Sequence, residues 1–302
     1  MGRIFGIVIF AVLIGAAIYV NQPGRLQGPL GENSTSTKGA VHEGGENIPP
    51  PQNEPPQEEP PPQGNLPSID PGEIPQGFTL DQLSPYFHKV RIATAFPGSP
   101  DDYSQIVLSA WFDGERAIPL KGWRLQGNKS FQNVPYRAVQ VYDPLGNAPE
   151  NNIYLRSGDS LNIYSTVSPI GRNLRLNKCL GYLEKYYDFN PPLYGGCPSI
   201  VDSYGISRFR GECQDYIYSL GYCAEPESNP PIALDDYECR AYLNKINYRG
   251  CFEKYQNDED FLGREVRAWT GNTGPNSKFL DFRHDRVLLL DQNGLLVDLY
   301  TY

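Results

Sequence analysis

Two stretches of the chain alternate hydrophobic and polar residues as β-strands do, and the stretch between them does not. In the first, residues 105–112 place Ile106 and Leu108 on one face, which is the period of a strand with one buried side. The predicted strands of this stretch are residues 90–95, 105–112, 120–125, 138–142, 152–155 and 160–164. Short strands separated by turns at this spacing indicate a mainly β fold, a sandwich or a barrel.

The second β-rich stretch ends the chain with a predicted hairpin. Residues 265–269 have the pattern of a strand, and residues 286–290 and 295–299 flank a turn with the sequence DQNG. Asn and Gly tolerate the positive φ angles of a tight turn, so this pattern is a good hairpin signal. The consecutive leucines of residues 288–290 predict a strand that is buried on both faces or nearly so.

Between these stretches, residues 175–262 show helical periodicity and include every cysteine of the chain. Residues 211–220 and 235–248 each place a cysteine and two aliphatic side chains at helical spacing. An even number of clustered cysteines predicts disulfide bonds if the compartment is oxidising. The six predicted disulfide cysteines are Cys179, Cys197, Cys213, Cys223, Cys239 and Cys251.

The helical pattern also suggests how these cysteines pair. If the two helices run antiparallel, the start of one lies beside the end of the other. This arrangement favours the bridges Cys213–Cys251 and Cys223–Cys239, with Cys179–Cys197 closing the loop before them, although the sequence permits other pairings. No metal site is expected, because the stretch has no C-x-x-C pair and all three histidines lie outside it.

The N-terminus has a pattern of its own, because residues 4–20 are an unbroken run of apolar and small residues preceded by Arg3. As a helix this run would be roughly 25 Å long at ~1.5 Å per residue, close to a hydrocarbon core of about 30 Å. Residues 1–22 are therefore predicted to be a single-pass membrane anchor, with the N-terminus cytoplasmic and the body outside. The alternative is a secretory signal peptide that is cleaved near Ala17.

Residues 23–77 are predicted to be a disordered, acidic, Pro-rich linker. Residues 49–62 read PPPQNEPPQEEPPP and have no apolar side chain to bury, so nothing offsets the entropy of ordering them. Proline favours an extended conformation of about 3.1 Å per residue, which suits a spacer. Residues 78–302 then form one β domain, and residues 175–262 are a cysteine-rich helical insert in it.

The net charge and the aromatic residues indicate which classes of binding partner the protein has. A formal net charge of -9 argues against a nucleic-acid binder, which would show a basic face. The predicted binding surface is formed by Tyr182, Tyr186, Tyr187 and Tyr194, because tyrosine offers rigid area with a polar tip. The alternative is that these tyrosines fill a small, half-hydrated core. The expected partners are the membrane, through residues 4–20, and a protein or polysaccharide of the cell envelope.

Three motifs of the β-rich stretches resemble a known family. Residues 120–125 read LKGWRL, residues 155–159 read LRSGD, and residues 287–298 read VLLLDQNGLLVD. Together they resemble the lamin-tail domain, an immunoglobulin-like β-sandwich, over residues 90–168 and 265–302. The resemblance implies a sandwich scaffold of the kind found on exported and membrane-attached bacterial proteins. It implies an attachment or binding role and names no catalytic residue.

No established catalytic motif is present in the sequence. The chain lacks a nucleophile elbow, a P-loop, a Gly-rich dinucleotide loop and an HExxH motif. His284 is expected to lie in a loop or at a strand edge. The prediction is a non-enzymatic binding module of the envelope that needs no cofactor. The alternatives are an enzyme or accessory domain acting on nucleic acid or cell-wall polymer, and a glycan-binding module.

Overall fold

The computed structural model describes residues 69–99, 103–143, 148–193, 196–199, 205–271 and 279–302. The predicted anchor at residues 4–20 and most of the predicted linker lie outside these ranges. Within them, every helix is too short or too polar to cross a membrane.

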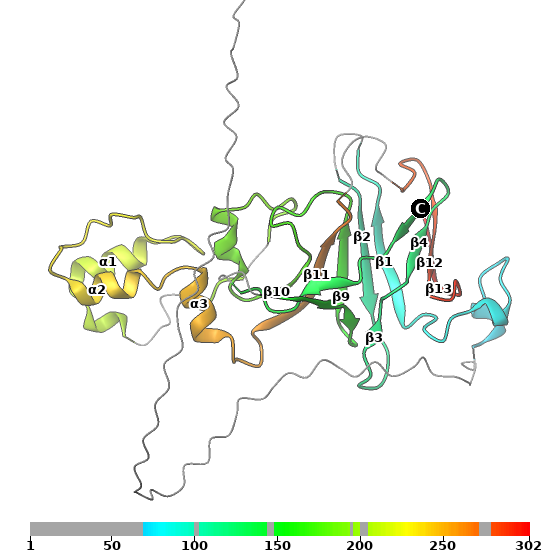
Figure 1. The fold of residues 1–302 in the computed structure, drawn as a ribbon, viewed down its shortest axis with the longest axis horizontal. Helices are drawn as coiled ribbons and strands as arrows, with labels where there is room; N and C mark the ends of the chain where they lie inside the picture. The colour runs from blue at the N-terminus through cyan, green and yellow to red at the C-terminus, as the bar shows by residue number, and fades with distance from the viewer. Residues whose placement is uncertain (1–68, 100–102, 144–147, 194–195, 200–204, 272–278) are drawn as a thin grey trace, which may run out of the picture. The chain divides into compact units, whose positions relative to one another are not determined.

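The described residues are mainly β, as predicted, and their strands form three sheets (Figure 1). The largest sheet contains, in spatial order, β1 (Val90–Phe96), β2 (Gln105–Ala110), β9 (Ser160–Tyr164), β11 (Leu262–Trp269), β10 (Leu174–Asn177), β6 (Arg137–Val139) and β7 (Glu150–Asn152). The second contains β13 (Leu296–Thr301), β12 (Arg286–Leu290), β4 (Arg124–Gln126) and β5 (Phe131–Asn133). A short pair is formed by β3 (Ile118–Pro119) and β8 (Tyr154–Leu155).

The two larger sheets share one hydrophobic core. The inward side chains of β2, β9 and β11 and those of β4, β12 and β13 belong to the same buried cluster. The alternation read from the sequence accounts for this, since Ile106 and Leu108 are buried while their neighbours in β2 are only half-buried. Trp123, just before β4, is the largest fully buried side chain of this core.

Two short helices, η1 (Pro71–Glu73) and η2 (Leu80–Gln82), precede β1, and the other helices follow β10 and precede β11 in the sequence. β10 and β11 pair antiparallel, and Asn177 is the partner of Leu262. The predicted insert of residues 175–262 therefore begins slightly later than expected, because residues 175–177 belong to β10. We call residues 178–261 the cysteine-rich insert. Its helices are η3 (Leu180–Lys185), η4 (Ile206–Arg208), α1 (Gly211–Ser219), α2 (Tyr237–Leu243) and α3 (Tyr248–Tyr255).

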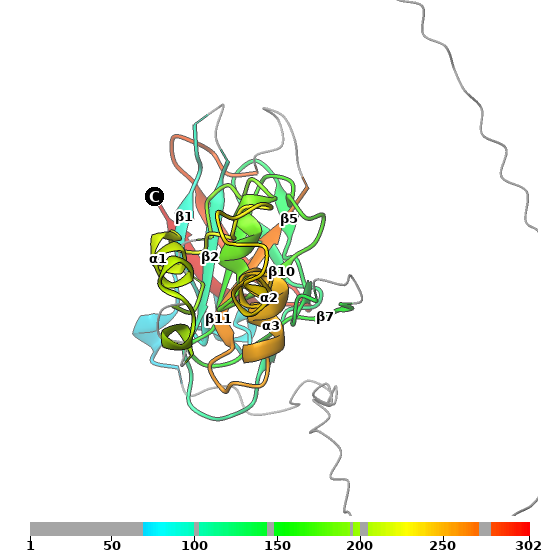
Figure 2. The same ribbon diagram turned by 90° about the vertical axis from the view of Figure 1, so that its left-hand side faces the viewer.

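A second hydrophobic core joins this insert to the large sheet. Tyr164 of β9 and Trp269 of β11 are buried in the same cluster as the cysteines and aliphatic residues of the insert. Val266 and Ala268 of β11, in contrast, point into the core between the sheets. The insert thus covers the outer face of the large sheet around β9, β10 and β11, away from β4 and β12 (Figure 1), and its helices lie in front of the sheet when seen from that side (Figure 2).

A buried arginine strengthens this contact. Arg267 of β11 is 4% exposed, and it donates hydrogen bonds to Glu265 at 2.7 Å and to the carbonyl oxygens of Pro191 and Pro192 at 2.8 and 3.0 Å. A buried guanidinium is tolerated only when its donors are satisfied in this way. The guanidinium of Arg267, on the outer face of the sheet, therefore binds the insert and is not exposed to water.

The predicted helix at residues 235–248 ends early in the structure, and a separate helix begins at its last residue. The sequence pattern predicts a single helix over residues 235–248, whereas α2 ends at Leu243 and α3 begins at Tyr248. The side chain of Asn247 accepts a hydrogen bond from the backbone nitrogen of Gly250 and so caps α3. Asparagine at this position favours a helix start over a helix interior.

All six cysteines form disulfides, as predicted, but all three predicted pairings are wrong. Cys213–Cys251, Cys223–Cys239 and Cys179–Cys197 are not formed; the bridges are Cys179–Cys251, Cys197–Cys223 and Cys213–Cys239. The prediction placed the start of one helix beside the end of the other. Instead, the bridge between α1 and α2 joins their first turns, and the sixth cysteine lies in the separate helix α3.

Gly250 provides the tight approach that this arrangement needs. A Cβ at this position would overlap the backbone carbonyl of Lys245. We expect Gly250→Ala to lower the free energy of unfolding by at least about 2 kcal/mol, because backbone must move to admit the methyl group. Denaturant unfolding of the full chain measures the change.

Gly211 is the matched control, because it starts α1 in the same insert and a Cβ there meets nothing within 4 Å. Gly211→Ala is expected to leave stability unchanged or raise it by up to about 1 kcal/mol. Equal losses in the two variants would contradict the proposed close approach.

Candidate functional site

The cysteine-rich insert contains a cavity of about 340 Å³. This volume lies at the lower end of the range of about 300–1,000 Å³ that is usual for small-molecule sites. The lining residues come from η3, from the segment after Cys197, and from the end of α2 and the length of α3: they are Tyr182, Pro198, Ser199, Tyr242, Lys245, Ile246, Gly250, Cys251, Glu253, Lys254 and Tyr255.

The disulfide Cys179–Cys251 holds two walls of the cavity together. Cys179 caps the start of η3, and Cys251 lies in α3. Tyr182 follows three residues after the first cysteine and Tyr255 four residues after the second, so both rings project near the bridge. Cys251, one half of the bridge, is itself a lining residue of the cavity.

Tyr182 is the most buried aromatic group of the lining, with 3% of its surface exposed. Burial is the main cause that raises the pKa of its hydroxyl to about 12, and the nearby carboxylate of Glu225 acts in the same direction. The hydroxyl is therefore neutral at physiological pH. A neutral hydroxyl can both donate and accept a hydrogen bond.

The other two tyrosines are half-buried and lie among cations and rings. Tyr255 has the ammonium of Lys254 at 4.8 Å and that of Lys178 at 5.3 Å from its ring centroid, within the range of cation–π contact. The ring of Tyr242 packs against that of Phe209 at 5.0 Å. These contacts fix the rings in place, so the lining is largely preformed.

Only part of the predicted tyrosine surface reaches this cavity. Tyr182 lines it but is buried, so it is not the exposed surface residue that the sequence predicted. Tyr186 is 60% exposed and donates its hydroxyl to Glu225 outside the cavity. Tyr187 is half-buried and packs against Phe189 at 6.3 Å. Tyr194 lies outside the described residues.

The sequence pattern did not point to Tyr242 or Tyr255 as site residues. One signal was present, because Tyr255 follows Cys251 by four residues and so lies on the same helical face as the disulfide. Crowding of tyrosines along the chain, which directed attention to residues 182–194, does not report which rings converge in space.

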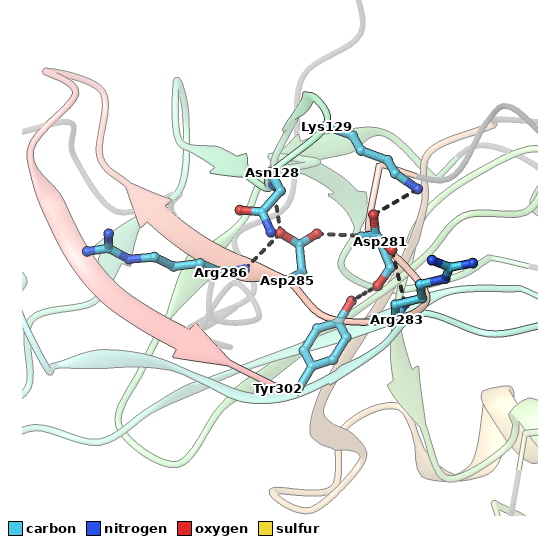
Figure 3. A network of polar contacts seen from close by, with 7 residues as sticks. All are labelled: Asn128, Lys129, Asp281, Arg283, Asp285, Arg286 and Tyr302. Carbon is cyan, nitrogen blue, oxygen red and sulfur yellow. Dashed lines mark hydrogen bonds and ion pairs between the residues drawn. The ribbon is translucent and has the colours of Figure 1, made fainter.

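A cluster of polar side chains lies at the edge of the four-stranded sheet where β12 begins and β13 ends, near the last residue, Tyr302 (Figure 3). The carboxylate of Asp285, which is 1% exposed, accepts hydrogen bonds from the backbone nitrogens of Asn128, Asp281 and Arg286 at 2.6–2.8 Å. A carboxylate saturated by backbone donors serves structure rather than chemistry. His284 is exposed in the loop beside it.

Neither a metal site nor a known relative assigns a function to the described residues. Across the described ranges, no three His, Cys, Asp or Glu residues lie together so that they could hold a metal ion. Comparison with protein-family models, with curated proteins and with solved structures finds no match to this chain. The cavity of the cysteine-rich insert is therefore the candidate site on its geometry alone.

Proposed function

We propose that this chain is a non-enzymatic binding module that acts outside the cytoplasm and takes an envelope polysaccharide in the cavity of its cysteine-rich insert. The three disulfides support an oxidising compartment. The apolar run at residues 4–20 would anchor the chain in the membrane, and the Pro-rich linker would hold the domain away from it.

The scaffold in this proposal is an immunoglobulin-like sandwich of the lamin-tail type. The shared core of the two larger sheets supports the sandwich, whereas the lamin-tail resemblance rests on the sequence motifs at residues 120–125, 155–159 and 287–298. Such a scaffold supplies rigidity and carries its recognition site in an insertion between strands.

The observation that carries the proposal is the convergence of three tyrosines on one cavity. A sugar ring has an apolar C–H face and a rim of hydroxyl groups. Tyrosine matches both, because its ring packs on the face and its hydroxyl bonds to the rim. This favours a glycan over the protein partner that the sequence also allowed.

The test is retention of the purified full chain on immobilised neutral and acidic polysaccharides. Tyr255→Ala is expected to weaken binding tenfold or more, since buried aromatic anchors dominate recognition. Tyr237→Ala is the matched control, because Tyr237 is 77% exposed in the same insert and does not line the cavity. Its binding should stay within about twofold of wild type.

Two results would contradict this function. One is the absence of binding to every polymer, and the other is an equal effect of the two tyrosine variants. Release of soluble fragments from a polymer would instead favour the enzymatic alternative. Circular dichroism of each variant shows whether lost binding reflects lost structure.

A further inference from the structure

Two lysines bring positive charge to the cavity of a protein that is negatively charged as a whole. Lys245 follows the end of α2, and Lys254 lies in the last turn of α3; both are exposed and both line the cavity. Neither ammonium forms an ion pair with another described residue. Lys129, Lys178 and Lys185, in contrast, each have a carboxylate partner.

Glu253, the one acidic residue among the described lining side chains, does not cancel these charges. The carboxylate of Glu253 accepts a hydrogen bond from the guanidinium of Arg249 at 2.8 Å, one turn earlier on α3. This pair is largely neutral as a unit. Lys245 and Lys254 therefore bring to the cavity two cations that have no carboxylate partner among the described residues, in a protein whose formal net charge is -9.

We propose that the cavity selects an anionic sugar residue, with the tyrosine rings against the sugar and Lys245 and Lys254 on its negative group. This inference rests on the proposed function and specifies its ligand. The shared chemistry is one carboxylate, sulfate or phosphate on a sugar ring, which forms charge-assisted hydrogen bonds with an ammonium.

An acidic peptide is the competing ligand, and the cavity shape argues against it. A peptide bound by charge needs an extended groove or a free sheet edge along which its backbone can lie. This site is a single hollow of about 340 Å³ beside a disulfide. A hollow of that size accommodates one or two rings better than a strand.

The experiment compares ligands that differ in charge alone. The full chain is titrated with tetragalacturonate and with its neutral methyl ester, and then with oligomannuronate and a heparin tetrasaccharide as other acidic sugars. We expect at least one acidic sugar to bind tenfold or more tightly than the neutral ester. Tetraglutamate represents the acidic peptide, and it should bind no better than the ester.

Charge-removing variants locate the effect. Lys245→Gln and Lys254→Gln are each expected to weaken binding of the acidic sugar by about five- to tenfold, less than the full worth of a charge-assisted hydrogen bond because both lysines are exposed. Binding of the neutral ester should not change. Lys121→Gln is the matched control, because Lys121 is exposed before β4, far from the lining in sequence and absent from it.

The outcomes separate this inference from the proposed function. Charge selection is overturned if acidic and neutral sugars bind with equal affinity, and if Tyr255→Ala weakens this binding while the lysine variants do not. That result would still agree with the proposed polysaccharide-binding function. Tight binding of tetraglutamate through the same lysines overturns the sugar assignment. Failure of every saccharide to bind overturns both proposals.

Discussion

Replacement of Asp285 by alanine is expected to lower the free energy of unfolding by at least about 3 kcal/mol. The variant leaves the backbone N–H groups of Asn128, Asp281 and Arg286 without their acceptor (Figure 3). These hydrogen bonds are only partly buried, so each donor left unpaired costs about 1 kcal/mol, the lower end of the usual range of about 1–3 kcal/mol. The same residue pairs its backbone with that of Tyr302, so the loss should loosen the C-terminal strand as well.

Denaturant unfolding of the full chain under non-reducing conditions measures this effect. Asp281→Ala is the control, because that carboxylate lies in the same cluster but is partly exposed, where it pairs with Lys129. Its loss should be clearly smaller. A similar loss in both variants would show that the cluster acts through surface charge and not through satisfied backbone donors.

Removal of the bridge Cys179–Cys251 by a double alanine change is the second large expected effect. This bridge spans 72 residues, against 26 for the bridge Cys213–Cys239. In the chain-entropy model the longer loop is worth about 4.4 kcal/mol and the shorter about 3.5 kcal/mol. We expect the Cys179–Cys251 variant to be the less stable of the two.

The two disulfide variants should also differ in binding. The longer bridge joins η3 to α3 and includes Cys251, a lining residue of the cavity, whereas the shorter one links α1 to α2. Loss of the first should therefore abolish saccharide binding at temperatures where the second variant still binds. Limited proteolysis within residues 178–261 provides an independent readout. Equal binding by the two variants would remove the structural role given to the longer bridge.

The sheet was readable from sequence because its strands bury one face and expose the other. The predicted strands at residues 160–164 and 286–290 coincide with β9 and β12. The predicted hairpin around residues 291–294 corresponds to β12 and β13, with Gly294 at a φ of 79°. Local alternation and turn chemistry suffice for such elements, because neither depends on distant residues.

The disulfide pairing could not be predicted from sequence, because it depends on residues that are distant along the chain. Which cysteines meet depends on how the helices of the insert cross, and the periodicity of residues 235–248 concealed the break between α2 and α3. The presence of disulfides follows from composition and compartment, whereas their partners follow from tertiary geometry. The cavity shares this limit, since Tyr182, Tyr242 and Tyr255 come from three separate helical segments.

Arg267 illustrates a further limit of sequence patterns. A charged residue that alternates with Val266 and Ala268 predicts a solvent-facing side of the strand. In the structure this side is covered, and the guanidinium binds carbonyl groups of the insert. A pattern that describes one sheet face correctly cannot report that a second layer will cover the other.

The pairing of Asn177 with Leu262 has a practical consequence for protein engineering. The polypeptide departs from the sheet and rejoins it at neighbouring positions, so a short turn is long enough to replace the whole insert. Such a deletion would, however, expose Tyr164 and Trp269 and give the shortened protein an aromatic surface that is prone to aggregation. A transplant of the insert into another β-sheet protein should therefore bring these two strand residues with it.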